Sequence, residues 1–313
     1  MTSPTNSVPE SPASSELPAP SSNAAAIRPL YWSVWRELWE NRSIYIAPLI
    51  VAAVQVFGFA ISAIGLAERR RAALALGDAV KLRAGMEQPY DIAAMMMIFT
   101  VFVVGAFYCL DALHGERRDR SILFWKSLPV SDLTTVLSKV TIPLVVLPVI
   151  CFALVVCVQL IMVLETSVVL IIHGMSPATT WTIIPFFQDW LVLLYGLIAL
   201  ALWHAPIYGW LLLVSGWARR ATFLWAVLPL IAIQILEKIA FGTAHFGAFI
   251  GHRLMGFAPS AFYFGAHKTP AIHSLTQLTP GRFLSGPGLW LGLLVAVAFL
   301  AATIRLRRYR GPL

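Results

Sequence analysis

Charged residues are scarce in this chain of 313 residues. Asp, Glu, Lys and Arg make up only 12% of it, whereas soluble proteins contain about 25%. Hydrophobic residues account for 58%, and the mean hydropathy is +0.77. Because ionised groups are costly in hydrocarbon and apolar side chains are not, this balance excludes an ordinary water-soluble protein. It indicates a chain embedded in a bilayer.

Cysteine is also rare, and the three that occur (Cys109, Cys151 and Cys157) all fall inside apolar runs. Cysteines in such runs behave as small hydrophobic residues, so no disulfide framework is predicted. Four histidines lie between residues 242 and 286, but no acidic residue or cysteine accompanies them and their spacing matches no standard zinc pattern. We therefore expect no metal and no cofactor, and we interpret these histidines as solvated or interfacial: His245, His252, His267 and His273.

Three catalytic motifs are missing. The chain has no G-x-x-x-x-G-K-[ST] phosphate loop, no H-E-x-x-H zinc-protease motif and no G-x-S-x-G nucleophile motif. We expect no enzyme activity, and in particular no ATP hydrolysis by this chain alone. The net charge of +8 could suggest nucleic acid, but the basic residues are scattered at the ends of apolar runs and form no single face. We expect no nucleic-acid partner.

What the sequence does contain is a series of long apolar runs. Taking about 20 residues per helical crossing, we predict an all-α membrane protein with six transmembrane helices, at 43–67, 92–110, 140–164, 190–218, 221–241 and 283–304. Residues 1–26 are rich in Ser, Pro and Ala and contain no secretory apolar region, so we expect a disordered tail.

A seventh crossing at 166–188 is the main alternative. This segment has no charged side chain, but His173-Gly174, Pro177 and Pro185 would break a continuous helix. Six spans with the N-terminus inside leave 14 Lys and Arg on the inner side and 8 on the outer side. Seven spans divide the same residues equally, so the excess of positive charge inside favours six.

One charge cluster disagrees with this orientation. The sequence Glu68-Arg69-Arg70-Arg71 falls outside, directly after the first span. The rest of 68–91 is polar, and we expect a small extracytoplasmic helix around 72–84.

Residues 27–42 predict an amphipathic helix before the first span. Trp32, Trp35 and Trp39 follow a spacing of three and four and share one stripe of such a helix. Indole rings favour the headgroup region, so we expect this helix to lie at the membrane interface. The alternative is a merely aromatic start to the first span.

The most informative segment is the charged stretch 111–139 between the second and third spans. It contains Glu116, Arg117, Asp119 and Arg120, and it must lie in water. Residues 116–126 predict a short helix that Pro129 ends. Ser131 and Asp132 then supply N-cap chemistry for a helix that continues through Lys139 into the third span. An ordinary charged loop is the alternative interpretation.

This segment resembles the corresponding part of type-2 ATP-binding-cassette (ABC) exporter permeases. The residues that carry the resemblance are Glu116-Arg117, Ile122-Leu123, Ser127-Leu128-Pro129-Val130-Ser131 and Lys139. The likeness extends to the amphipathic N-terminal helix, the six spans and the long segment 242–286, and so covers roughly residues 27–310.

The resemblance implies a bacterial inner membrane permease that pairs with a second permease subunit, identical or not, and with a separate cytoplasmic ATPase. It implies cytoplasmic termini, and ATPase coupling through residues of 111–139: Glu116, Arg117, Asp119, Arg120, Leu128 and Pro129. It also implies short re-entrant helices on the extracytoplasmic side within 242–286, where the sequence alone equally allows an irregular loop. The substrate would pass along spans one, two and five, and an amphipathic or lipid-like substrate fits their lack of charge.

Three further residues are candidates for a gate or pathway. Glu237 and Lys238 lie near the end of the fifth span, where ionisable groups are expensive and often functional, although side chains that snorkel to the interface are the simpler explanation. His204 lies inside the fourth span next to Pro206, where a packing kink is the alternative to a proton relay.

Other functional classes remain open. A membrane anchor or regulatory subunit would bind an ATPase without transport. An ion-coupled secondary transporter needs several ionisable groups at the bilayer midplane, and here only His204 lies near one. A membrane enzyme would need a catalytic constellation that the sequence does not contain.

Overall fold

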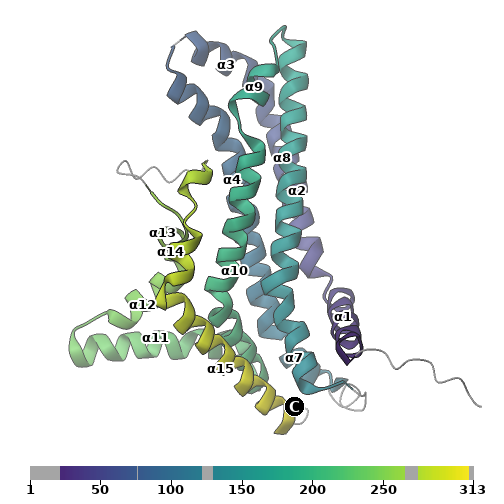
Figure 1. Ribbon diagram of the computed structural model, residues 1–313, viewed down its shortest axis with the longest axis vertical. Helices are drawn as coiled ribbons and strands as arrows, with labels where there is room; N and C mark the ends of the chain where they lie inside the picture. Colours follow the sequence, from purple (N-terminus) through teal and green to yellow (C-terminus); the bar gives the residue numbers. More distant parts are fainter. Residues whose placement is uncertain (1–21, 76, 122–129, 265–273, 310–313) are drawn as a thin grey trace, which may run out of the picture.

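The computed structural model describes residues 22–75, 77–121, 130–264 and 274–309 (Figure 1). Within these residues the regular structure is entirely helical, with one isolated bridge between Phe262 and Leu278. Six helices in this part of the chain are long and apolar enough to cross a membrane. They are Ser43–Ala75, Val80–Arg118, Asp132–Ile172, Phe186–Trp217, Thr222–Phe241 and Pro287–Tyr309. The predicted all-α membrane protein with six spans is confirmed.

Four long helices form the body of the bundle. They are α2 (Ser43–Ser62), α4 (Ala79–Asp111), α8 (Leu147–Ile172) and α10 (Phe186–Trp217), and they lie side by side in Figure 1. The core between them contains fully buried apolar side chains, among them Met97, Leu147 and Leu212. Cys109 and Cys151 are buried there too.

The last helix, α15 (Pro287–Tyr309), packs diagonally across α10 (Figure 1). The crossing is close because Gly209 of α10 has no side chain. A Cβ atom at this position would lie 3.4 Å from the carbonyl oxygen of Ala296. Small residues allow such close approach between helices in membranes.

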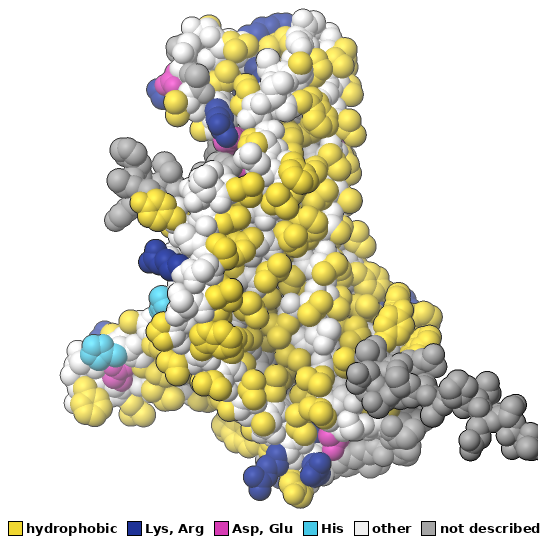
Figure 2. Space-filling model, viewed as in Figure 1, with side chains coloured by type: hydrophobic (Ala, Val, Ile, Leu, Met, Phe, Trp, Pro, Cys, Tyr) yellow, Lys and Arg dark blue, Asp and Glu magenta, His cyan; other side chains and the backbone are white. Residues whose placement is uncertain are grey.

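The bundle has two polar ends, which we name after a helix at each. The α1 end carries α1 (Ser22–Glu40), α5 (His114–Arg118), α7 (Asp132–Thr141) and the end of α15. The α3 end carries α3 (Leu66–Ala75) and α9 (Ala178–Ile183) (Figure 1). In Figure 2 most Lys, Arg, Asp and Glu side chains lie toward the two ends and on a projection formed by residues 222–255. The long face between the two ends is largely hydrophobic. This is the distribution that a bilayer requires.

The first two spans extend beyond the predicted limits at the α3 end. A short turn, η1 (Ala63–Gly65), joins α2 to α3, which continues to Ala75, and α4 begins at Ala79. The helix predicted around residues 72–84 is wrong, because the chain breaks in its middle. Gly77 has φ +68°, in the left-handed region. The Asp78 carboxylate then accepts the amides of Val80 and Lys81 at the start of α4.

Residues 166–188 do not form a seventh span. α8 ends at Ile172 and is followed by Gly174 with φ +71°. The short α9 comes next, and Pro185 precedes the start of α10. The breaks fall at the glycine and prolines that disfavoured this crossing in the sequence.

The helix of the third span contains a wider turn near its start. α7 continues into η2 (Ile142–Val146), a π-helical segment that contains Pro143, and then into α8. Proline has no amide to donate, and π-turns inside α-helices are found at functional sites.

α11 (Thr222–Phe241) leaves the base of α10 and runs sideways, across the direction of α8 (Figure 1). Its one buried side chain is Ala226, which packs near the end of α10. The described part of the following segment, 242–264 and 274–286, contains short helices: α12 (His245–Met255), α13 (Phe257–Ala261), η3 (Leu275–Gln277) and α14 (Pro280–Ser285).

The N-terminal helix is longer than expected at its start. α1 begins at Ser22, so residues 22–26 belong to a helix and not to the predicted disordered tail, and it ends at Glu40. The remainder of that predicted tail, residues 1–21, lies outside the described residues.

Candidate functional site

Helix α1 presents two different faces. Trp32, Trp35 and Trp39 are exposed, with 69%, 44% and 75% of their surface accessible. Ser33 and Glu37, four residues apart on the other face, are buried. This face packs against α7. The tryptophan stripe is thus turned away from the protein, while an acidic side chain is turned into it.

Glu37 forms a buried ion pair with Lys139 of α7. The Lys139 Nζ lies 2.9 Å from Glu37 Oε1 and 3.1 Å from Oε2. The Tyr108 hydroxyl of α4 donates to Glu37 Oε2 at 2.8 Å, and the neighbouring Arg36 donates to Oε1 at 2.8 Å. Both carboxylate oxygens therefore have partners, as a buried charge requires.

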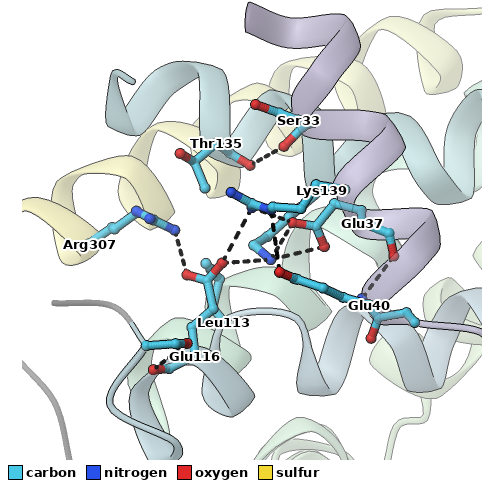
Figure 3. Close-up of polar contacts among 12 residues, drawn as sticks. Ser33, Glu37, Glu40, Leu113, Glu116, Thr135, Lys139 and Arg307 are labelled. Atoms are coloured by element: carbon cyan, nitrogen blue, oxygen red, sulfur yellow. Dashed lines mark hydrogen bonds and ion pairs between the residues drawn. The ribbon is translucent and has the colours of Figure 1, made fainter. Parts of the chain in front are cut away.

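Glu116 of α5 extends this pair toward α15. Its Oε1 lies 3.0 Å from Lys139 Nζ, and its Oε2 accepts from Arg307 at 2.8 Å. Arg307 also donates through Nε to Asp132, at the start of α7, at 3.0 Å. Lys139 therefore bridges the carboxylates of Glu37 and Glu116 (Figure 3). Arg307 bridges those of Glu116 and Asp132.

We call these six residues the charge network: Arg36, Glu37, Glu116, Asp132, Lys139 and Arg307. It contains three carboxylates and three cations, so its formal charge is zero. Figure 3 shows the labelled members converging from different helices. The network joins α1, α5, α7 and α15 at one end of the bundle. A buried arrangement of this kind is sensitive to the loss of any one member, because the partner is left as an uncompensated charge.

The electrostatics of Glu37 follow from this arrangement. Burial alone would raise the pKa of its carboxyl group. The attraction of Lys139, with the hydrogen bonds from Arg36 and Lys139, outweighs burial and lowers the pKa below its usual value. Glu40, one turn further along α1, behaves in the opposite way, since partial burial raises its pKa more than Arg36 lowers it.

A second set of contacts fixes α5 to the end of α10. The Arg117 guanidinium donates to the carbonyl oxygens of Gly216 and Ala218 at 2.9 and 3.2 Å. The Ser215 hydroxyl oxygen accepts from the amides of Leu113 and His114 at 3.0 and 2.9 Å. These bonds satisfy backbone groups that both helix ends leave without partners. The start of the 111–139 segment is therefore held on two sides.

The predicted coupling residues divide into two groups. Glu116 and Arg117 are buried inside the chain, so they contact α7, α10 and α15 and present little surface. Asp119 and Arg120 are exposed, directly after α5. Leu128 and Pro129 lie outside the described residues. Of the helix predicted over 116–126, residues 116–118 belong to α5 (His114–Arg118), which ends before Arg120 with its left-handed φ of +58°. Residues 122–126 lie outside the described residues.

The other end of the segment agrees with its sequence. Ser131 is the N-cap of α7, and its hydroxyl oxygen accepts the amide of Thr134 at 3.1 Å. The helix continues past Lys139 into the third span, as predicted.

Two of the candidate gate residues, Glu237 and His204, make their contacts outside the charge network. Glu237 accepts the Thr243 hydroxyl and the amides of His245 and Phe246 at 2.7–2.8 Å, so it holds the start of α12. Lys238 is exposed. His204 is buried in α10, and its two ring nitrogens lie 3.1 Å from the carbonyl oxygens of Leu200 and Leu254. These contacts account for Glu237 and His204 as links between helices.

Sequence reasoning did not find the pairings of Glu37, Lys139 and Arg307. The signal was present as single ionisable residues at the ends of three different apolar segments, with signs that can balance. Hydropathy treats each of them as a span boundary and cannot assign partners across segments. No protein-family model, no curated protein and no solved structure matches this chain.

Proposed function

We propose that this chain is the membrane-spanning permease subunit of an ATP-driven ABC transporter, with outward transport, coupled to a separate cytoplasmic ATPase through residues 111–139. The observation that carries this proposal is the charge network. It holds both ends of that segment, through Glu116 at one end and Asp132 and Lys139 at the other.

This anchoring supports a mechanical role for the segment. Its exposed part, with Asp119 and Arg120, offers charge to a soluble partner. Its buried ends are tied to α1, α10 and α15. A displacement imposed on the exposed part is therefore passed to several helices together. The π-helical turn at η2, directly after α7, is a natural place for α8 to bend in response.

One further feature, the exposed helix α11, is consistent with a partner in the membrane. α11 projects from the bundle (Figure 1) and buries only Ala226 within the chain. Its exposed apolar side chains need cover from lipid or from another helix. In this proposal a second permease subunit packs against α11, the tryptophan stripe of α1 lies in the lipid interface, and the α1 end faces the cytoplasm of the cell that carries the protein in its inner membrane.

The proposal is tested by capture of the ATPase. The tagged chain is purified from its native membranes in mild detergent, and co-purified proteins are identified by mass spectrometry. We expect a cytoplasmic ATPase with a G-x-x-x-x-G-K-[ST] loop. Reversing the exposed charges with Asp119→Lys and Arg120→Glu should remove it while the purified chain keeps its helical content.

The control reverses two exposed charges at the opposite end, with Glu68→Lys and Lys81→Glu. This variant should capture the ATPase as the native chain does. Unchanged capture by the Asp119 and Arg120 variant would contradict docking at this segment. If the ATPase binds at this segment but the reconstituted complex moves no lipid-like probe across vesicle membranes, the chain would be an anchor or regulatory subunit and not a permease.

A further inference from the structure

A cavity of about 290 Å³ lies at the α3 end of the bundle, between α2, α3, α4, α8 and α9. The described residues that line it include three cations and no carboxylate. The cations are Arg69, Arg70 and Lys81, and the remaining walls are mostly apolar or small, with hydroxyl groups from Tyr90, Thr166 and Thr180. The lining of the cavity is therefore positively charged and otherwise largely apolar.

Arg70 is the distinctive residue of this cavity. It is only 8% exposed, and its guanidinium donates to two neutral atoms, Thr180 Oγ1 and Met86 Sδ, both at 2.8 Å. Two of its five N–H donors are used in this way. A guanidinium stays protonated at every physiological pH. A buried charge without an opposite charge is costly, so this one has the character of a half-completed ion pair.

Nearby carboxylates do not complete the pair. Asp78 lies 3.2 Å from Lys81, and Glu87 lies 2.7 Å from Arg83. Glu165 of α8 is adjacent to Thr166 in sequence but does not line the cavity. Arg69 donates to the carbonyl oxygens of Ser62 and Gly65, which carry no net charge. The local excess of positive charge remains.

A second cavity of about 360 Å³ adjoins the first between α2 and α4. The two share Phe59, Ser62 and Pro89 in their walls. The second is lined mainly by apolar side chains, including Ile92, Met96 and Met162. Flexible methionines adapt well to irregular apolar ligands. The first cavity, which is basic, therefore lies beside the second, which is apolar.

We propose that these two cavities bind one anionic amphiphile. Its phosphate or carboxylate group pairs with Arg70, assisted by Arg69 and Lys81, and its hydrocarbon chain lies in the second cavity along Phe59 and Met96. The anion supplies the negative charge that Arg70 lacks among the described residues of the chain. A small free anion would satisfy the basic cavity alone and would leave the apolar one without an occupant.

The test measures binding to the purified full-length chain in uncharged detergent, by native mass spectrometry and by thermal stabilisation. Three probes separate the contributions: lysophosphatidic acid, lysophosphatidylcholine with the same acyl chain, and inorganic phosphate. No ATPase is present, so the result does not depend on the proposed transport function.

Four variants locate the site, and they form two pairs of a test substitution and its matched control. Arg70→Gln removes the buried cation, and Arg71→Gln makes the same change at an exposed neighbour that binds the His173 carbonyl oxygen. Gly58→Leu fills the apolar cavity, and Gly251→Leu makes the same change on α12. A Cβ at either glycine meets no atom within 4 Å, so both positions have room for the first atom of a side chain.

We expect lysophosphatidic acid to bind at least about tenfold more tightly than lysophosphatidylcholine, because the zwitterion cannot complete the charge. Arg70→Gln and Gly58→Leu should each weaken this binding by a similar factor, and Arg71→Gln and Gly251→Leu should not.

Equal binding of the two lipids, or native affinity in Arg70→Gln, would overturn the proposal. The proposal would also be overturned if inorganic phosphate bound with the same affinity as lysophosphatidic acid and Gly58→Leu left that affinity unchanged, since the site would then take a free anion. Without ligand, Arg70→Gln should melt no lower than Arg71→Gln. A clearly lower melting temperature would mean that Arg70 holds the fold and not a ligand.

Discussion

The ammonium of Lys139 lies 2.9 Å from a carboxylate oxygen of Glu37, and only 2% and 0% of their side-chain surfaces are exposed. The two residues are 102 positions apart in the sequence. Their pair fixes the amphipathic helix α1 to the start of the third span. The position of α1 is therefore set by a specific ion pair within the chain.

Replacement of Lys139 by methionine should destabilise the protein strongly. The substitution keeps an unbranched side chain but leaves Glu37 and Glu116 as two buried carboxylates without their shared cation. We expect a loss of about 3–5 kcal/mol in the free energy of unfolding, measured by denaturant titration in detergent. Lys81→Met is the control, because Lys81 is 84% exposed in its pair with Asp78. It should change stability by less than about 1 kcal/mol, and equal effects would contradict the network.

Stability should also fall in acid because of Glu37. Its pKa is lowered from 4.5 in the folded protein. The folded state therefore holds this proton less tightly than the unfolded state does. The stabilisation from Glu37 is complete above pH 4.5, and it is lost as the pH falls through the lower pKa that Glu37 has in the folded protein. Melting temperatures measured across this range should decline for the native chain. Glu37→Gln should flatten the decline.

Glu40 provides the control for that experiment, because its pKa is raised. The stabilisation that Glu40 contributes is present below pH 4.5, and it is lost as the pH rises through the pKa that Glu40 has in the folded protein. Removing it with Glu40→Gln should therefore make the acid decline steeper. The two substitutions on one helix are expected to change the pH profile in opposite directions, and the same change from both would refute the assignment.

The parts of the fold that follow from local pattern were predictable from the sequence. The six apolar runs became six helices because each can satisfy its own backbone hydrogen bonds. Ser131 became an N-cap, and Gly174 and Pro185 interrupted 166–188 as expected. These outcomes depend on residues close in sequence. The break at Gly77 was missed because a glycine between good helix formers can also be tolerated within a helix.

The site was only partly predictable, because its pairs are not local. Glu116 was identified, but its inward orientation toward Lys139 and Arg307 depends on how three helices pack. Arg70 was counted as an unfavourable charge outside the first span. Its burial between α3, α4 and α9 could not be read from hydropathy, which sums residues along the chain and carries no information about neighbours across it.

The tryptophan stripe of α1 should enter a lipid interface. A peptide of residues 27–42 presents Trp32, Trp35 and Trp39 on one side, and all three are exposed in the protein. Added to phosphatidylcholine vesicles, its fluorescence should shift to the blue as the indole rings leave water. A peptide of the same composition in scrambled order loses the stripe and should shift less. Equal shifts would show that composition alone, and not the stripe, causes binding.

Reporter fusions separate the fold from the functional proposal. Glu116 and Arg307 are in contact, so reporters after residue 120 and at the C-terminus must lie on the same side of the membrane, whichever side it is. The helix Asp132–Ile172 places a reporter after residue 175 on the opposite side, and we expect one after 265 to agree with it. Opposite sides for the reporter after 120 and the C-terminal reporter would contradict the fold.

The same reporters test the orientation of the chain. The excess of Lys and Arg at the α1 end predicts that the reporter after 120 is cytoplasmic, although Arg69, Arg70 and Arg71 at the α3 end oppose this bias. If the reporter after 120 is extracytoplasmic while the C-terminus agrees with it, the fold stands. No cytoplasmic ATPase could then reach Asp119 and Arg120, and the proposed coupling is excluded.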